Sequence, residues 1–299
     1  MTTLLLGATG LLGRAIREAS TVLVPERSQA DLAVATVQDW SSLLETLGAT
    51  SVINAAAMAR VDRCETEIES ATAVNAEGPG RLASACADRS VPLVQVSTDY
   101  VFGDQKRRGP GPYGERARHG PVQTYGATKA RGEKEVLAQG WCNTIARVSW
   151  LFGPGGDPFG GFVLGQVDAG ATAVEVMMAQ QSRPTWVPDL ARWLLDVARA
   201  LEEDASGSTR EKGLPLVPPI LHPTGGPATD RGTWARTILS ARGIEVPVVD
   251  QGDPPSTLVA ARPLDSRLEG AATAQWGEAR GIASILDWRE GVRKIHSSA

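Results

Sequence analysis

The sequence predicts an α/β fold in which a doubly wound parallel sheet is followed by a smaller C-terminal domain. Short apolar runs and amphipathic stretches alternate through the first half of the 299 residues. The runs "LLL", "VLV", "SVI" and "LVQV" are aliphatic and nearly unbroken, as strands buried on both faces should be. Strands that alternate with helices form right-handed βαβ units, and these favour a parallel sheet.

The expected elements follow in chain order. Segment 102–124 is rich in Gly, Pro and charge, so it is predicted to be a long excursion loop, and 205–215 interrupts a helical pattern. Strands are expected at residues 3–7, 21–26, 51–57, 91–97 and 143–153. Helices are expected at 11–19, 40–48, 69–89, from 125, and at 188–205 and 231–243.

Composition narrows the classes of function. The net charge is −4, with Lys and Arg scattered along the chain, so nucleic acid is not an expected partner. The three cysteines stand far apart without a CxxC pair, which predicts neither a metal site nor a disulfide framework. His119, His222 and His296 are expected to be solvated. The first residues suit neither a signal peptide nor a membrane span, so we expect no membrane association and a cytoplasmic location.

Three glycines follow the first predicted strand directly. Gly7, Gly10 and Gly13 are spaced as GxxGxxG and lead into a helix. Such a turn is tight, lets the backbone approach a pyrophosphate, and presents the free N–H groups of a helix N-terminus to it. Any strand-to-helix turn favours glycine, but this position at the end of the first strand predicts dinucleotide binding in a Rossmann-type domain.

The end of the second predicted strand bears on the choice of cofactor. Glu26 would accept hydrogen bonds from the ribose hydroxyls of NADH, whereas Arg27 and Ser28 would hold the 2′-phosphate of NADPH. We favour NADPH, with NADH as the alternative. The simplest interpretation of "ERSQ" is a polar turn.

Two further strand ends carry small or polar residues. Residues 55–57 are alanines, which would let a ring or ribose lie against the sheet, or would only allow close helix packing. Ser97, Thr98 and Asp99 end another strand, where hydroxyls would hydrogen-bond a ligand carbonyl or cap the next turn.

Tyr125 and Lys129 lie four residues apart, so a helix places both side chains on one face. In an arbitrary surface helix, such a Tyr would half-cover the core and such a Lys would be solvated. Beside a glycine turn and a strand-end threonine, the pair predicts a catalytic site. Arg147, two strand positions before Ser149, is expected to be a buried structural arginine.

Five motifs together resemble a known family. Gly7-x-x-Gly10-x-x-Gly13, "NAAA", "VSTDYVFG", Tyr125-x-x-x-Lys129 and "RVSWLFGP" occur in the order and spacing of the extended short-chain dehydrogenase/reductases. In kind, the chain is most similar to the dTDP-4-dehydrorhamnose reductase family. The resemblance covers residues 1 to about 200, with weaker echoes in 181–191 and in "ARPLDSRL".

The resemblance implies NADPH-dependent reduction of the keto group of a nucleotide-linked deoxysugar. It implies an NAD(P)-binding domain over 1–150, to which 181–205 returns, a substrate-binding domain mainly over 151–299, and a possible homodimer. Catalytic roles fall to Thr98, Tyr125 and Lys129, with Tyr125 as proton donor. The implied cofactor-binding residues are Gly7, Thr9, Gly10, Leu11, Leu12, Gly13, Arg27, Ser28, Asp31, Leu32, Ala55, Ala56, Ala57, Asn75, Ser97, Tyr125 and Lys129. The implied substrate-binding residues are Thr98, Asp99, Tyr100, Trp150 and Arg60.

The chain also departs from the family pattern. Ala59 and Arg60 follow "NAAA" where the family often has a hydroxyl residue, so a substrate contact is lost or Arg60 serves a more acidic substrate. An epimerase or dehydratase of the same superfamily is one alternative, and a non-catalytic NADP-binding regulatory subunit is another. Reduction is preferred because no Asp-Glu or Cys pair stands beside Thr98.

Overall fold

The computed structural model describes residues 2–140, 142–252 and 258–297. Its central sheet has five strands, all parallel, in the order β1-β2-β3-β4-β9. The first four strands confirm most of the predicted ones. Their bounds are β1 (Thr3–Leu6), β2 (Ser51–Asn54), β3 (Leu93–Thr98), β4 (Asn143–Val148) and β9 (Ile220–Leu221).

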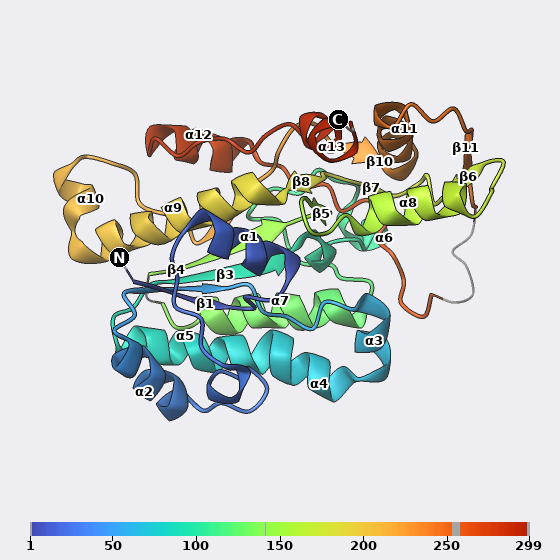
Figure 1. Cartoon of the computed structure of the whole chain (residues 1–299). Coiled ribbons are helices and arrows are strands. Elements are labelled where there is room, and N and C mark those ends of the chain that lie inside the picture. Colours follow the sequence, from blue (N-terminus) through green and yellow to red (C-terminus); the bar gives the residue numbers. More distant parts are fainter. Residues whose placement is uncertain (1, 141, 253–257, 298–299) are drawn as a thin grey trace.

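Helices cover both faces of this sheet, as a doubly wound fold requires (Figure 1). Successive strand side chains point to opposite faces, so Leu4 and Leu6 enter one core cluster and Leu5 enters the other. One face carries α2 (Val37–Leu47), α5 (Gly78–Asp88) and α7 (Thr124–Leu137). The other carries α1 (Leu11–Ala19) and α9 (Val187–Ser206).

The predicted helix 69–89 is continuous but irregular. It consists of α4 (Ile68–Thr72), a π-helical turn (Ala73–Glu77) and α5. Pro79, which cannot donate a backbone hydrogen bond, lies just after the π-helical turn, where the helix changes to the α pattern.

Two predicted strands were partly wrong. Residues 21–26 form only a single bridge, between Leu23 and Leu4. This segment lies at the sheet edge, where Val24 is 46% exposed, so no second strand holds it. The strand predicted over 143–153 breaks after β4, because Trp150 adopts a positive φ of 42°. The chain resumes as β5 (Leu151–Phe152), which pairs with β8 (Thr185–Trp186).

The two segments predicted to be irregular, 102–124 and 205–215, each contain a short helix. The excursion loop contains α6 (Gln105–Arg108), and Tyr113 within it forms a bridge to Leu268. The break after α9 contains α10 (Ser208–Glu211).

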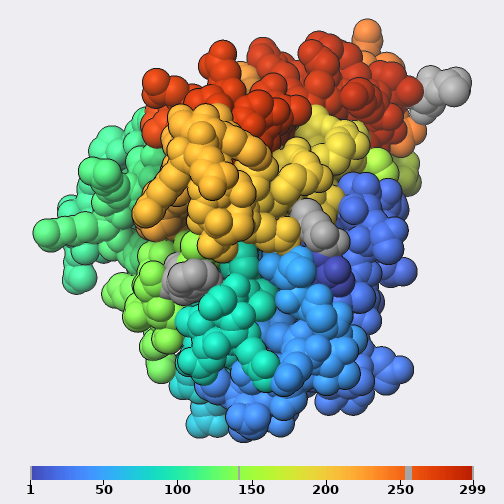
Figure 2. Space-filling model, turned by 90° about the vertical axis from the view of Figure 1, so that its left-hand side faces the viewer, coloured from blue at the N-terminus to red at the C-terminus, as the bar shows by residue number. Residues whose placement is uncertain are grey.

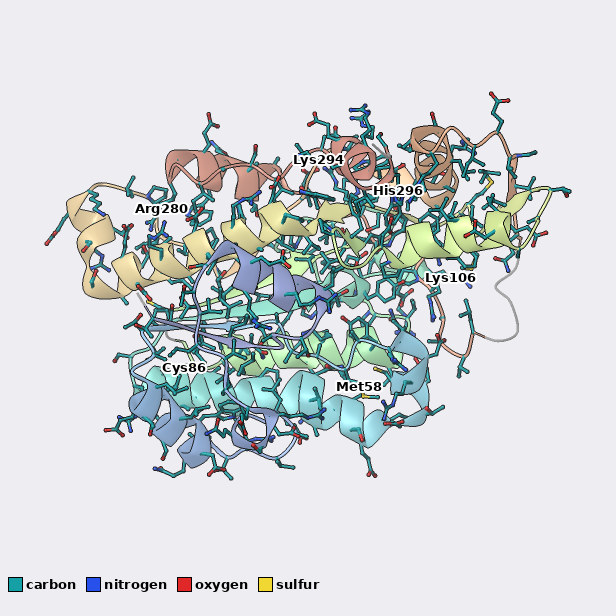
Figure 3. The ribbon with its side chains drawn as sticks, viewed as in Figure 1. Met58, Cys86, Lys106, Arg280, Lys294 and His296 are labelled. Carbon is teal, nitrogen blue, oxygen red and sulfur yellow. The ribbon has the colours of Figure 1, made fainter. Side chains whose placement is uncertain are left out.

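The second half packs along one side of the sheet. Figure 2 shows its C-terminal residues, in red, as a cap at the top of the molecule, with orange and yellow residues between this cap and much of the blue and teal N-terminal half. Arg280, labelled in Figure 3, ties this cap to the end of α9 through Glu203 and Asp204. The remaining elements are α3 (Val61–Thr66), α8 (Pro158–Asp168), β6 (Val174–Val176), β7 (Gln181–Ser182), β10 (Thr229–Asp230), α11 (Arg231–Ala241), β11 (Val248–Asp250), α12 (Ala271–Ala279) and α13 (Trp288–His296).

α9 packs on α1, and β9 is a strand of the five-stranded sheet. Segments after residue 150 therefore contribute to the sheet and to the helices that cover it. The division into two domains at residue 150 stays a prediction. Among the described residues, no helix combines the length and apolarity needed to span a bilayer.

The expectation of solvated histidines was wrong. His222 is fully buried, His296 is 3% exposed, and the His119 side chain is 18% exposed. His296, at the end of α13 (Figure 3), lies 2.9 Å from the Asp157 carboxylate, which caps the N-terminus of α8. The sequence did not show the partners of these histidines, because Arg147, Glu133 and Asp157 lie far from them along the chain.

Replacing Gly132 with alanine should destabilise the fold. A Cβ there would lie 2.2 Å from the Asn75 carbonyl oxygen, so α7 would have to move away from the π-helical turn. We expect Gly132→Ala to lower the free energy of unfolding by about 1–3 kcal/mol, measured by urea denaturation. Gly165→Ala is the control, because that helical position has nothing within 4 Å and alanine favours helix. Equal effects of the two substitutions would contradict the packing argument.

Candidate active site

The glycine turn is built by close backbone contacts. Gly7 has a φ of 79°, and a Cβ there would lie 2.6 Å from the Ala56 nitrogen. A Cβ on Gly13 would lie 2.1 Å from the Gly7 carbonyl oxygen, so α1 can begin this close to β1 only with glycine. Gly10, the N-cap residue of α1, has no side chain to occupy the free N–H groups of the first turn.

A cavity of about 390 Å³ adjoins this turn. The carboxyl ends of β1 and β2 form its floor, and Arg27 lies on its rim. The predicted cofactor residues that line it are Gly7, Thr9, Gly10, Arg27, Asp31, Leu32 and Ala55–Ala57. Residues that sequence reasoning missed are Leu5, Leu6, Ala8, Val24, Pro25, Ala30 and Val74, for which proximity to the predicted strand ends was the available signal.

Arg27 presents an exposed guanidinium beside the cavity. Its side chain is 89% exposed, and its Nε lies 3.5 Å from the Asp31 carboxylate. Ser28 belongs to the same 3₁₀ turn (Arg27–Gln29) but does not line the cavity. A backbone cradle that excludes a Cβ, a helix N-terminus and an exposed guanidinium fit a dinucleotide with an additional phosphate.

Several predicted cofactor residues point elsewhere. Leu12 is buried in the hydrophobic core, and Leu11 packs beside Gly156. The Asn75 side chain is buried and hydrogen-bonds both the N–H and the carbonyl of Met58, so it holds the loop after β2. None of these side chains lines the cavity.

Thr98 ends β3 and caps the 3₁₀ turn Asp99–Val101. Its Oγ1 accepts from the Tyr100 N–H at 3.2 Å and donates to Asp99 Oδ1 at 3.2 Å. The carboxyl ends of β1, β2 and β3 lie side by side, so Thr98 stands at the same sheet edge as the glycine turn.

Tyr125 lies in the first turn of α7, half-buried against the end of β3. A Cβ on the next residue, Gly126, would lie 2.0 Å from the Tyr100 carbonyl oxygen, so this glycine seats the helix on the 3₁₀ turn. Burial raises the pKa of Tyr125, and a hydrogen bond with Thr98 opposes this increase. Tyr125 and Thr98 therefore lie at the same end of β3.

Lys129 lies one turn further along α7 and is 3% exposed. Its Nζ donates to the Val96 carbonyl oxygen at 2.7 Å. Burial lowers the pKa of Lys129 to about 8, and the Glu133 charge opposes this decrease. The strongest influences on the Tyr125 pKa are burial, Thr98 and Asp99, so the expected effect of the Lys129 charge on the phenolate stays a prediction.

A buried polar network lies behind these residues. Glu133 accepts from Arg147 Nη2 at 2.7 Å and from Ser97 Oγ at 2.5 Å, and its Oε2 lies 2.8 Å from His119 Nε2. Arg147 Nη1 lies 3.2 Å from His222 Nε2. The structure therefore directs Ser97 into this network and not toward the cavity, while Arg147 is the buried structural arginine that the sequence predicted.

Trp150 follows β4 in a strained backbone conformation, a feature that clusters at functional sites. The Arg231 guanidinium lies 3.7 Å from its ring centroid, and Trp234 stacks on it at 5.3 Å. The Arg231 guanidinium lies 5.3 Å from the Trp234 ring centroid. If the two groups lay on opposite faces of Trp150, this distance would approach the sum of their distances from Trp150, so both cover the same face. Sequence reasoning missed Arg231, because only the fold brings α11 to this strand end.

The other predicted substrate residues differ in their surroundings. Tyr100 is half-buried, with its ring edge-on to Tyr125 at 6.1 Å. Arg60 is exposed at the N-cap of α3. The Asp99 carboxylate is buried and accepts hydrogen bonds from Ser182 and Ser266, two partners that the sequence did not predict.

Comparisons with known proteins agree with this geometry. The family model described as "RmlD substrate binding domain" matches residues 1–299. The dTDP-4-dehydrorhamnose reductase of Mycolicibacterium smegmatis is 34% identical over 297 residues, covering 96% of this chain and 82% of that protein. The enzyme of the same name from Streptomyces griseus is 33% identical over 96% of this chain and 90% of its own length.

Solved structures show the same fold. A dTDP-4-dehydrorhamnose reductase from Clostridium acetobutylicum has a TM-score of 0.79 and 28% identity, with 98% of each chain covered. The protein of that name from Bacillus anthracis, solved in complex with NADP, has a TM-score of 0.81 and 24% identity, again with 98% of each chain covered. The chain therefore belongs to the RmlD substrate binding domain family, within the extended short-chain dehydrogenase/reductases that its motifs resemble.

Proposed function

We propose that the protein reduces the keto group of a dTDP-4-keto-6-deoxyhexose with NADPH, in deoxysugar biosynthesis. The observation that carries this proposal is the packing of α7 on the end of β3, which brings Tyr125, Lys129 and Thr98 to the sheet edge that also holds the glycine turn. The relatives in Mycolicibacterium smegmatis and Streptomyces griseus carry the name dTDP-4-dehydrorhamnose reductase, which supports the substrate class.

When bound, NADPH supplies the hydride. In the proposed reaction, Thr98 holds the substrate oxygen beside Tyr125, and Tyr125 gives that oxygen its proton. The Lys129 ammonium stabilises the phenolate that remains, and anchors the nicotinamide ribose. With a pKa of about 8, Lys129 is mostly protonated at neutral pH, which suits this role.

The cofactor would lie in the cavity beside the glycine turn. Its pyrophosphate would meet the first-turn N–H groups of α1, and Arg27 would hold the 2′-phosphate. Ser28 would assist from the same turn. This arrangement favours NADPH over NADH.

The substrate would lie between the two halves of the chain. The face of Trp150 that Arg231 and Trp234 leave uncovered would receive the pyranose, whose C–H groups are apolar. Tyr100 and Arg60 would contact the rest of the sugar nucleotide. A cytoplasmic location and a homodimer stay predictions.

The direct test incubates the protein with NADPH and dTDP-4-dehydrorhamnose, with other keto-sugar nucleotides in parallel. We expect stoichiometric NADPH oxidation and a reduced sugar. Sugar conversion without net oxidation would support an epimerase or dehydratase instead, and no turnover with any substrate would support the regulatory role.

Tyr125→Phe removes the proposed proton donor but little cofactor contact. Because a general acid contributes about 10²–10⁴-fold, we expect kcat to fall by at least about 100-fold while the Kd for NADPH changes little. Tyr113→Phe is the control, since its hydroxyl bonds the Gly109 carbonyl in the excursion loop. Activity of Tyr125→Phe within a few-fold of wild type would refute the assignment.

Arg27→Ala tests the cofactor preference. Loss of a charge-assisted contact to the 2′-phosphate should raise the KM for NADPH by about 10-fold and leave the KM for NADH nearly unchanged. Steady-state kinetics with both cofactors measures this difference. Arg17→Ala, an exposed arginine near the end of α1, is the control. Equal changes for the two cofactors would show that Arg27 does not bind the 2′-phosphate.

A further inference from the structure

The Asp99 carboxylate joins the end of β3 to the second half of the chain. Asp99 is 2% exposed. Its Oδ2 accepts hydrogen bonds from Ser182 Oγ at 2.8 Å and from Ser266 Oγ at 2.5 Å. Its Oδ1 accepts from the Thr98 hydroxyl at 3.2 Å. One side chain therefore contacts both the proposed catalytic threonine and two serines that lie far along the sequence.

The two serines belong to neighbouring segments. Ser182 ends β7, and the Ser266 N–H donates to the Gln181 carbonyl oxygen at 3.1 Å. Gln181 also forms a bridge with Asp265. Both segments belong to the same half of the chain as Arg231, which contacts Trp150. The hydrogen bonds from the serines to Asp99 therefore depend on how that half packs against β3.

We propose that Asp99 is a positioning residue. It holds the Thr98 hydroxyl in place when segments 181–182 and 265–268 are packed against the end of β3. The inference rests on the proposed function: Asp99 holds the Thr98 hydroxyl before the substrate binds, and the hydroxyl then turns its proton to the substrate oxygen. Two serine donors on one carboxylate oxygen hold the carboxylate plane, and that plane directs the other oxygen toward Thr98. Loss of the serines would free the carboxylate to rotate, and Thr98 with it.

The arrangement requires an ionised carboxylate, because three hydroxyls donate to it. Burial raises the pKa of Asp99 to about 6, and the bonds from Ser266, Ser182 and Thr98 oppose this increase. A proton on Oδ2 would displace the serine donors, so the serines would no longer hold the carboxyl group that positions Thr98. Activity should therefore fall as the pH drops through about 6.

Other charged groups around Asp99 do not replace the serines. Arg231 of α11 also favours the ionised carboxylate. Tyr100 and Tyr125 are neutral near pH 7, since burial raises the pKa of each phenol. The charged residues next to the serines have partners of their own: Asp265 pairs with Arg267, and Arg183 Nη1 donates to the Gly226 carbonyl oxygen.

The kinetic test uses the double variant Ser182→Ala/Ser266→Ala in the full-length protein, with NADPH and dTDP-4-dehydrorhamnose. Both lost bonds lower the Asp99 pKa, so their removal should raise it and move the acid limb of the kcat profile upward by about one pH unit. The KM for NADPH should stay within about twofold, because neither serine lines the cofactor cavity. Asp99→Asn, which cannot ionise, should lose this limb.

Ser51→Ala is the matched control. Ser51 is also fully buried and hydrogen-bonded, but its partner is the Thr3 hydroxyl at the opposite end of the sheet. Its profile should match that of wild type. A merely structural loss in the double variant would lower activity at every pH without moving the limb.

A second readout does not depend on activity. In the double variant, the Tyr100 amide, which donates to Thr98 Oγ1, and the Gln181 amide should exchange with deuterium about tenfold faster by NMR, while the Leu5 amide of β1 is unchanged. An unmoved acid limb, or unchanged exchange at Tyr100 and Gln181, would overturn the proposal. If wild-type protein reduces no keto sugar, the proposed function fails, and the exchange result alone decides whether Asp99 positions Thr98.

Discussion

The buried ion pair between Glu133 and Arg147 is the interaction on which the site depends. Both side chains are 1% exposed, and their closest atoms lie 2.7 Å apart. Burial would raise the pKa of Glu133, but His119 and Arg147 outweigh it and lower the pKa to about 2. Removing one partner would leave a buried charge uncompensated, so the bonds from Ser97 of β3 and Arg147 of β4 hold α7 against both strands. Because Tyr125 and Lys129 belong to α7, this packing also determines where their side chains lie.

Backbone contacts set how closely α7 can approach. Gly126 meets the carbonyl of Tyr100, and Gly132 meets the carbonyl of Asn75. A side chain at either position would lift the helix and separate Tyr125 from Thr98. The glycines on this helix therefore have the same physical role as those in the turn after β1: each lets a helix lie directly against another backbone.

The two halves of the chain meet at the carboxyl edge of the sheet. The first half brings the glycine turn, Thr98 and the α7 pair to this edge, while the second brings Arg231 and the serines that hold Asp99. Trp150 belongs to the first half by sequence but takes its surroundings from the second. Recognition of a sugar nucleotide would thus be assembled across the halves, whereas the proposed proton donor and the glycine turn are built within one.

By itself, the sequence determined the features that depend on spacing along the chain: alternating strands and helices, glycines at 7, 10 and 13, a hydroxyl at the end of β3, and a Tyr and a Lys one helical turn apart. Local geometry alone relates these residues, so their pattern can be read directly. Tertiary structure decided which side chains pair over long distances. It buried His222, directed Ser97 to Glu133, placed two serines on Asp99, and left residues 21–26 with a single bridge to β1. Those outcomes depend on which segments the topology brings together, and no local pattern encodes that.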